Sequence, residues 1–401
     1  MQHETDPLQN IPASACCDLN VEAAVRTRYS AAAERLEPQL CCAVNYQPQY
    51  LKIIPPEILE RDYGCGDPSR YVQPGEIVLD LGSGGGKICY IAAQIVGPRG
   101  RVIGVDCNDT MLALARKYQP EVASRLGYAN VEFRKGRIQD LRLDLDQLET
   151  WLQSHPARTV ADWLQTEEQA RQMRQAAPLI ASDSVDVVIS NCVLNLVQQA
   201  DREQLFSEIY RVLKRGGRAV ISDIVSDEDV PPALRNDPTL WSGCLSGAYR
   251  EDLFLEAFEA AGFHGIEIVT RQAEPWETVA GIEFRSLTVQ AFKGKSGPGF
   301  ERRQAVIYNG PWKSVTDDDG HTLQRGKRMA VCDKTFQIYS QAPYAGDITP
   351  LPPALDIPLA DAQPFDCTRD GLRDPRETKR AAPGGLSLIQ IDGGCGPAGC
   401  C

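Results

Sequence analysis

The sequence lacks long hydrophobic runs, and it has fewer basic than acidic residues. No stretch approaches the roughly 20 consecutive apolar residues that a membrane-spanning helix needs. The opening MQHETDPLQN is polar and lacks the basic and then apolar pattern of a secretory signal. The net charge of −12 disfavours binding to phosphate backbones and anionic lipid surfaces. We therefore expect a cytoplasmic, monomeric protein with neither a nucleic-acid nor a membrane partner.

Cysteine is abundant, with fourteen residues. They occur as doublets and at isolated positions, unlike the even spacing of a secreted disulfide scaffold. No C-x-x-C pair or Cys/His spacing indicates a zinc site, apart from the atypical C-terminal GGCGPAGCC. In a reducing compartment this usage points to soft-metal or redox chemistry. Some cysteines are nevertheless expected to be small buried hydrophobic residues, and we choose Cys89 and Cys107 for that role.

The chain divides into four predicted parts. Residues 1–75 form an N-terminal segment with a helix predicted over 21–37, and residues 76–293 alternate strand and helix patterns. Residues 294–350 are predicted as a small β-rich domain. Residues 351–401 are rich in proline and then in glycine and cysteine, so we expect them to be disordered. A polar, helical insertion at about 140–183 is either a lid over the site or a peripheral addition to the fold, and we favour the peripheral addition.

The alternating region predicts a doubly wound α/β fold with a seven-stranded sheet. Strands are predicted at 77–81, 101–106, 130–136, 185–190, 217–223, 266–271 and 284–293, with crossover helices near 87–96, 109–117, 201–214 and 250–261. Only AEPWETVAGIE separates the last two strands, so we expect them to pair as an antiparallel hairpin. A sheet that ends in this way is typical of the Rossmann-like methyltransferase fold rather than of the usual dinucleotide-binding fold.

A glycine-rich loop, DLGSGGG at 80–86, follows the first predicted strand and opens a helix. Such a loop lets the backbone approach a ligand closely. A dinucleotide fingerprint would need glycine at 87, where Lys87 stands. Asp80 suits a cationic amino-acid ligand better than a pyrophosphate. The loop thus has the D-x-G-x-G-x-G form of methyltransferases and predicts S-adenosylmethionine as cofactor, its methionine portion held by Asp80, Gly82, Ser83, Gly84 and Gly86.

Two later segments are predicted to complete the cofactor site. Asp106 ends the second strand, where a carboxylate accepts hydrogen bonds from both ribose hydroxyls. Cys107 follows it and is included among the cofactor-binding residues. After the third strand, Ile138 and Gln139 lie where the adenine ring should rest. An isolated glycine cluster would be an ordinary turn, but loop, acid and strand pattern together favour the cofactor.

The cysteines indicate which nucleophile accepts the methyl group. Most such nucleophiles need a general base, and the chain has few histidines that could act as one. None of His3, His155, His264 and His321 lies at the carboxyl end of a predicted strand, where a doubly wound sheet binds its ligands. Three cysteines lie near that edge, and they are Cys65, Cys192 and Cys244. Three converging thiols would capture a soft ion. Arsenic(III) bound in this way keeps a lone pair that attacks a methyl group without a base. Taken singly, each cysteine is also compatible with a buried apolar role.

Several blocks of the sequence resemble the arsenite methyltransferase family. They are YGCG at 63–66, VLDLGSGGGK at 78–87, SNCVLNLV at 190–197, RVLKRGG at 211–217, SGCLSGAY at 242–249 and AVIYNG at 305–310. The resemblance covers most of residues 20–350. It implies that Cys65, Cys192 and Cys244 bind arsenic(III), and that an upstream cysteine, Cys41 or Cys42 with Cys42 slightly favoured, pairs reversibly with Cys65. A thioredoxin- or glutathione-type reductant would complete that cycle.

Other features leave alternatives open. Asn191 either faces the methyl donor or caps the following helix. The long insertion and the tail beyond 350 depart from the family pattern, and Cys395, Cys400 and Cys401 either scavenge arsenite or have no role. The expected activity is methyl transfer to arsenite and methylarsenite, as in arsenic detoxification. The alternatives are a methyltransferase for another small molecule and a thiol-rich arsenic or metal sequestration protein.

Overall fold

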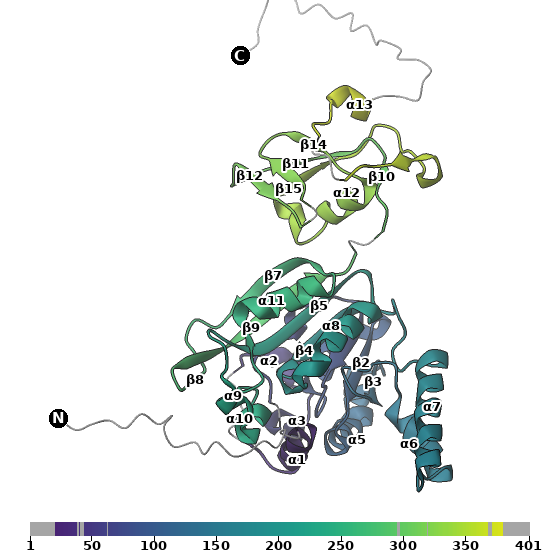
Figure 1. Ribbon diagram of the computed structural model, residues 1–401, viewed down its shortest axis with the longest axis vertical. Helices are drawn as coiled ribbons and strands as arrows, with labels where there is room; N and C mark the ends of the chain where they lie inside the picture. The colour runs from purple at the N-terminus through teal and green to yellow at the C-terminus, as the bar shows by residue number, and fades with distance from the viewer. Residues whose placement is uncertain are drawn as a thin grey trace, which may run out of the picture. The chain divides into compact units, whose positions relative to one another are not determined.

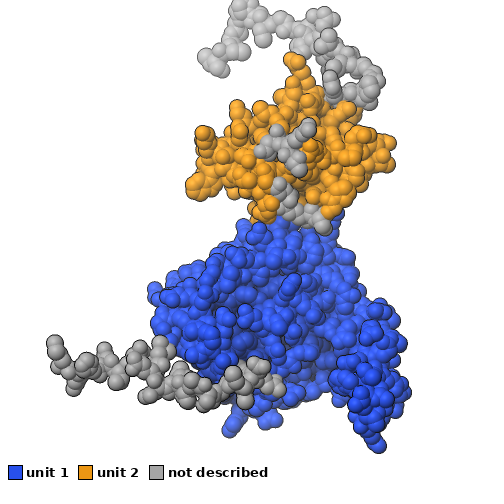
Figure 2. All heavy atoms as spheres, in the orientation of Figure 1, with its two compact units in different colours: residues 1–294 blue, residues 295–401 orange. Residues whose placement is uncertain are grey.

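The computed structural model describes residues 21–37, 40, 44–61, 63–294, 297–318, 320–367 and 371–379. The chain divides into two compact units, residues 1–294 and 295–401, which are coloured separately in Figure 2. Each unit has its own hydrophobic core. Within the described ranges, none of the helices combines the length and hydrophobicity needed to cross a lipid bilayer.

Unit 1 is built on a mainly parallel sheet whose principal path runs β3-β2-β1-β4-β5-β9-β7 (Figure 1). Its strands are β1 (Ile77–Leu81), β2 (Arg101–Asp106), β3 (Val131–Lys135), β4 (Val185–Asn191), β5 (Leu213–Ser226), β6 (Tyr249–Arg250), β7 (His264–Arg271), β8 (Glu277–Val279) and β9 (Ile282–Phe292). The first five pair in parallel, and β9 runs antiparallel to both β5 and β7. The predicted α/β class and the antiparallel end of the sheet are confirmed.

The core of unit 1 lies on both faces of this sheet, because neighbouring strand residues point to opposite sides. Leu79 and Leu81 of β1 belong to one hydrophobic cluster, whereas Val78 belongs to another. Helices α8 (Arg202–Val212) and α11 (Glu251–Ala260) contribute to the first cluster, and α4 (Lys87–Val96) and α5 (Asp109–Leu126) contribute to the second. Burial on both faces explains why the central strands are continuous apolar runs.

The order of the strands reverses at β1, which has β2 on one side and β4 on the other. In doubly wound sheets, ligands bind beyond the carboxyl ends of the strands at such a point. The remaining helices of unit 1 are α1 (Val21–Glu34), α2 (Pro48–Leu51), α3 (Pro56–Glu60), α6 (Leu145–Ser154), α7 (Val160–Ala176), α9 (Pro232–Arg235) and α10 (Pro238–Ser242). Helix α1 contacts α5 and α10, and the insertion that contains α6 and α7 lies at the β3 edge (Figure 1).

Unit 2 is a small β-rich unit around a three-stranded sheet of order β14-β11-β15. Its elements are β10 (Phe300–Glu301), β11 (Ala305–Tyr308), β12 (Ser314–Thr316), β13 (Thr322–Gln324), β14 (Arg328–Ala330), α12 (Asp333–Tyr339), β15 (Ile348–Leu351), β16 (Gln363–Pro364) and α13 (Pro375–Lys379). The disorder predicted from 351 onward is wrong for residues 351–367 and 371–379. Strand β16 pairs with β10, and Arg373 forms an ion pair with Glu301 at 2.7 Å. Residues 380–401 of the predicted tail lie outside the described residues.

Candidate active site

A cavity of about 460 Å³ lies at the carboxyl ends of β1, β2 and β4. Nine of the residues predicted to bind the cofactor line it, and they are Asp80, Gly82, Ser83, Gly84, Asp106, Cys107, Ile138, Gln139 and Asn191. Cys192 lines the same cavity. None of the histidines among the described residues does so. The structure therefore places the predicted cofactor site directly beside one of the three predicted arsenic-binding thiols.

The glycine-rich loop is shaped by backbone conformations that favour glycine. Gly82 has a φ of 70°, and a side chain there would collide with Val193. The hydroxyl of Ser83 is buried and has no hydrogen-bond partner within the described part of the chain, which suits a polar ligand in the cavity. Gly86 does not line the cavity. A Cβ on Gly86 would lie 2.7 Å from the Phe133 ring, and the φ of 88° also favours glycine, while the predicted cofactor contact of Gly86 stays a prediction.

Asp106 links the end of β2 to the glycine-rich loop. Its Oδ2 accepts a hydrogen bond from the backbone N–H of Gly84 at 2.9 Å, and its Oδ1 accepts one from Asn108 at 2.8 Å. Loss of contact with water raises the pKa of Asp106, and these N–H groups oppose that shift. Cys107 is exposed, so the prediction that it is a buried hydrophobic residue is wrong, whereas Cys89 is fully buried as predicted.

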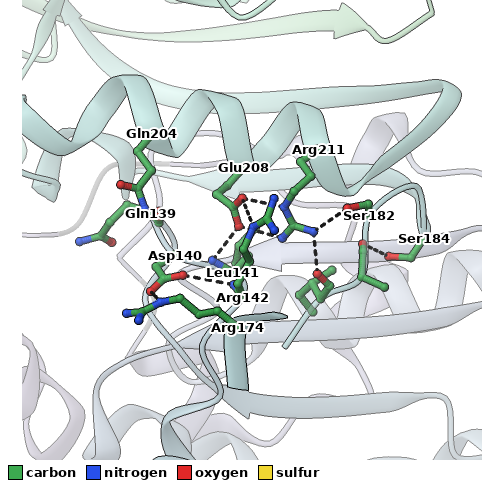
Figure 3. A network of polar contacts seen from close by, with 12 residues as sticks. Gln139, Asp140, Leu141, Arg142, Arg174, Ser182, Ser184, Gln204, Glu208 and Arg211 are labelled. Carbon is green, nitrogen blue, oxygen red and sulfur yellow. Dashed lines mark hydrogen bonds and ion pairs between the residues drawn. The ribbon is translucent and has the colours of Figure 1, made fainter. Parts of the chain in front are cut away.

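The segment after β3, which was predicted to contact adenine, is fixed by a network of polar contacts (Figure 3). The backbone N–H of Leu141 donates to Oε2 of Glu208 in α8 at 3.0 Å. Nε of Arg174 in α7 donates to Oδ2 of Asp140 at 2.9 Å. The insertion is therefore attached to the wall of the cavity next to Gln139. The sequence carries no signal for this attachment, because its residues come from separate elements.

The three predicted arsenic-binding cysteines lie in one hydrophobic cluster. Cys65, Cys192 and Cys244 are each more than nine-tenths buried. Cys65 and Cys192 form a disulfide with their Cα atoms 5.7 Å apart. The Sγ atom of Cys244 lies 3.3 Å from the backbone oxygen of Cys192. Cys41 and Cys42, the candidates for pairing with Cys65, lie outside the described residues.

Two of these cysteines have an unusual backbone conformation. Cys192 has a φ of 62° and Cys244 a φ of 65°, in the left-handed region that non-glycine residues rarely adopt. Each such residue costs about 1 kcal/mol or more and persists only where the surroundings impose it. Strain of this kind gathers at functional sites, and here it falls on the two cysteines that follow β4 and α10.

Asn191 holds the segment that carries Cys65 against the end of β4. Its Oδ1 accepts hydrogen bonds from the backbone N–H groups of Cys65 at 2.9 Å and Gly66 at 3.0 Å, and its Nδ2 donates to the Gly66 carbonyl at 2.8 Å. A side chain on Gly64 would collide with Asn191, which explains a glycine there. Asn191 thus faces the cavity and positions Cys65. Among the described residues, its side chain makes no helix-capping contact of the kind considered from the sequence.

Asp223 is a site residue that sequence reasoning missed. It lies in β5, is 1% exposed, and its carboxylate is within 4.8 Å of the Sγ atoms of Cys65 and Cys192. The carboxylate accepts backbone hydrogen bonds from Leu194 at 2.9 Å and Ile224 at 2.8 Å. Burial raises the pKa of Asp223 to about 7, although these N–H groups oppose the shift. Its place near the carboxyl end of a predicted strand was a usable signal.

Tyr29 of α1 is a second residue that the sequence did not single out. It lines the cavity, and its hydroxyl lies 4.0 Å from Sγ of Cys244. Burial, followed by the nearby Cys244, raises the pKa of Tyr29, so the phenol stays protonated beside the sulfur. Arg28 attaches α1 to α10 by donating to the Thr239 carbonyl at 2.8 Å and to the Ser242 hydroxyl at 3.1 Å. The predicted N-terminal helix therefore lines the cavity and reaches Cys244 through Tyr29.

Comparisons with known proteins define the class of the chain. A family model described as a methyltransferase domain matches residues 73–175 and 162–262, and a domain of unknown function matches residues 295–383. The crystal structure of an arsenic(III) S-adenosylmethionine methyltransferase from Chlamydomonas reinhardtii is 26% identical, with a TM-score of 0.53 over 80% of this chain and 100% of that chain. The fold, the cavity and these matches identify an S-adenosylmethionine-dependent methyltransferase.

Two curated relatives narrow this class. The arsenite methyltransferase of Aquipseudomonas alcaligenes is 32% identical over 326 residues, which are 77% of this chain and 84% of the relative. The human arsenite methyltransferase is 31% identical over 337 residues, which are 80% of this chain and 78% of the relative. The chain belongs to the arsenite methyltransferase family, and the resemblance inferred from the sequence blocks is confirmed.

Proposed function

We propose that the enzyme transfers methyl groups from S-adenosylmethionine to trivalent arsenic, as arsenite or methylarsenite, held by Cys65, Cys192 and Cys244. The observation that carries this proposal is that the three cysteines share one buried cluster and that Cys192 also lines the cofactor cavity. Such an activity converts arsenic inside the cell, and we place the enzyme in the cytoplasm, where thiols stay reduced.

The thiols account for substrate capture. Three As–S bonds form and three As–O bonds break when arsenite binds, and the thiol protons leave with the hydroxides as three waters. Sulfur is a soft ligand and is matched to a soft, thiophilic ion. The apolar surroundings, which include Ile224 and Phe284, keep water away from the captured arsenic.

The residues that line the cavity fit the cofactor. Asp80 offers a buried carboxylate for the amino group, Asp106 offers oxygen acceptors for the ribose hydroxyls, and the Ser83 hydroxyl is available to a polar group. When bound, the cofactor supplies a methyl group on a positively charged sulfur. Asp80 and Asp106 would hold the donor, while Asn191, which lines the cavity, fixes the backbone of Cys65.

Methyl transfer at this site needs no general base. With Asp80 and Asp106 holding S-adenosylmethionine, the cofactor would supply its methyl group to the arsenic lone pair, and the positive charge would pass from the cofactor to arsenic. The Asp223 carboxylate, within 4.8 Å of the Cys65 and Cys192 sulfurs, stabilises that charge as it develops. Asp223 also fixes the turn after Cys192 through the backbone N–H of Leu194.

The cycle requires a thiol reductant of the thioredoxin or glutathione type. The disulfide between Cys65 and Cys192 must be reduced before both sulfurs can bind arsenic. Methylation also leaves arsenic pentavalent, and two electrons must return it to the trivalent state. Two thiolates supply these electrons and become a disulfide. Pairing of Cys65 with Cys41 or Cys42 would provide such a disulfide within the chain.

The activity is expected to depend on that reductant. Transfer of a labelled methyl group from S-adenosylmethionine to arsenite should yield methylated arsenicals when thioredoxin or glutathione is present, and almost none when both are omitted. The measurement is chromatography of the labelled arsenicals. Label transfer only to an oxygen, nitrogen or carbon acceptor would indicate another methyltransferase. Tight arsenite binding without any transfer would indicate a sequestration protein.

A further inference from the structure

Two cysteines of unit 2 meet although they are far apart in the sequence. Cys332 directly precedes α12, and Cys367 follows β16. Strand β16 pairs with β10, and the backbone N–H of Phe300 in β10 donates to Oδ1 of Asp333 at 2.7 Å. These contacts bring three segments together beside Gly299. The site already described uses neither cysteine.

Gly299 marks the space between the two sulfur atoms. A Cβ on Gly299 would lie 2.8 Å from Sγ of Cys332 and 3.0 Å from Sγ of Cys367, both too close for an ordinary contact. Gly299 is not among the glycines with a positive φ, so its backbone conformation does not call for glycine. The absence of a side chain instead leaves room in which both sulfurs approach one point.

The two thiols differ in access to solvent. Both are in the thiol form, with Cys332 buried and Cys367 half-buried. Cys332 is fixed by Thr335, whose hydroxyl lies 3.2 Å and whose backbone N lies 3.4 Å from Sγ. The N–H of Phe365 donates to the Gly299 carbonyl at 2.9 Å and sets the position of the segment before Cys367. Cys367 is therefore the more accessible of the two thiols to a small solute.

We propose that Cys332 and Cys367 form a second arsenical site, a dithiol that binds methylarsenite. Two As–S bonds form, two As–O bonds break, and the two thiol protons leave with the hydroxides as two waters, without a change in oxidation state. Methylarsenite has two exchangeable ligands and matches two thiols, whereas arsenite would keep one hydroxyl. Soft sulfur ligands suit this ion. The choice of arsenic rests on the proposed function, but the paired geometry does not.

The direct test uses the full chain with Cys65, Cys192 and Cys244 replaced by serine. The reduced protein is treated with methylarsenite and digested, and the peptides are examined by mass spectrometry. A methylarsenic bridge is expected between the peptide that contains Cys332 and the peptide that contains Cys367. Bridges at other cysteines without this one would overturn the proposal. The result is independent of methyl transfer, because methylarsenite is supplied and the catalytic thiols are absent.

A glycine pair provides a matched test that keeps every thiol of the site. In the same background, Gly299→Ala should weaken methylarsenite binding at least about tenfold in equilibrium dialysis, because the new methyl group separates the sulfurs. Gly346→Ala should bind as the parent does, since a Cβ there meets nothing within 4 Å. Circular dichroism checks that both variants fold. Equal binding by the two folded variants would contradict a site centred on Gly299.

Discussion

Replacement of Cys192 or Cys244 with serine is expected to reduce arsenite methylation by at least about 10²-fold, because arsenic then loses one of its three anchors. A hydroxyl is a hard ligand and does not substitute for a thiolate at a soft ion. Both cysteines are buried and held in left-handed conformations, so no neighbouring side chain can move in and take the place of the lost thiolate. The measurement is the rate at which labelled methyl groups from S-adenosylmethionine appear in arsenicals.

Two controls separate this effect from a general loss of structure. Cofactor binding, measured by calorimetry, should survive in Cys244→Ser, because Cys244 does not line the cavity. Cys367→Ser, in unit 2, should form the monomethyl product from arsenite at the parent rate. If Cys192→Ser and Cys244→Ser bind the cofactor and still methylate arsenite, the thiolate site is wrong and the cysteines are structural.

The second large effect is expected for Asp223→Asn, a change that keeps the shape of the side chain and removes its charge. The methylation rate should fall by about 10² to 10³-fold, because the carboxylate stabilises the positive charge that reaches arsenic. The pKa of Asp223 is about 7, so the parent enzyme should gain activity as pH rises through that value. The variant should lack this rise. A rate profile from pH 6 to 8 for both proteins measures the difference.

Asp223 should also contribute to the pH dependence of the free energy of unfolding. Its pKa in the folded protein is raised from 3.8 to about 7, so folding favours the protonated form. This contribution to stability is complete below pH 3.8 and is lost as pH rises to about 7. Asp223→Asn should remove that part of the pH dependence in urea unfolding. Parallel stability profiles for the two proteins would mean that Asp223 titrates normally, and the proposed electrostatic role would then fail.

The lining of the candidate cofactor cavity was predictable because its determinants are local. The glycine-rich loop directly follows β1, and Asp106 directly ends β2, so strand, turn and acid are recognisable in short windows of sequence. The class of fold followed from the same strand pattern. Cys107 shows the limit of that reasoning, because whether a side chain is buried depends on neighbours that are distant in the sequence.

The proposed arsenic site was predictable only in part. The positions of Cys65, Cys192 and Cys244 came from strand ends and from sequence blocks that resemble the family. Asp223 and Tyr29 were missed, since their importance lies in distances to sulfur atoms across the fold. The left-handed conformations of Cys192 and Cys244 could not be predicted either, because a cysteine in the sequence does not indicate the value of φ.

X-ray absorption spectroscopy at the arsenic edge tests the central claim most directly. The sample is the reduced chain with one equivalent of arsenite, in which Cys367, Cys395, Cys400 and Cys401 are replaced by serine so that unit 1 supplies the arsenic-binding thiols. Three sulfur neighbours and no oxygen are expected around arsenic, and two sulfurs with one oxygen in the additional Cys244→Ser variant. An oxygen-bound arsenic in the parent, or a spectrum that Cys244→Ser leaves unchanged, would contradict that claim.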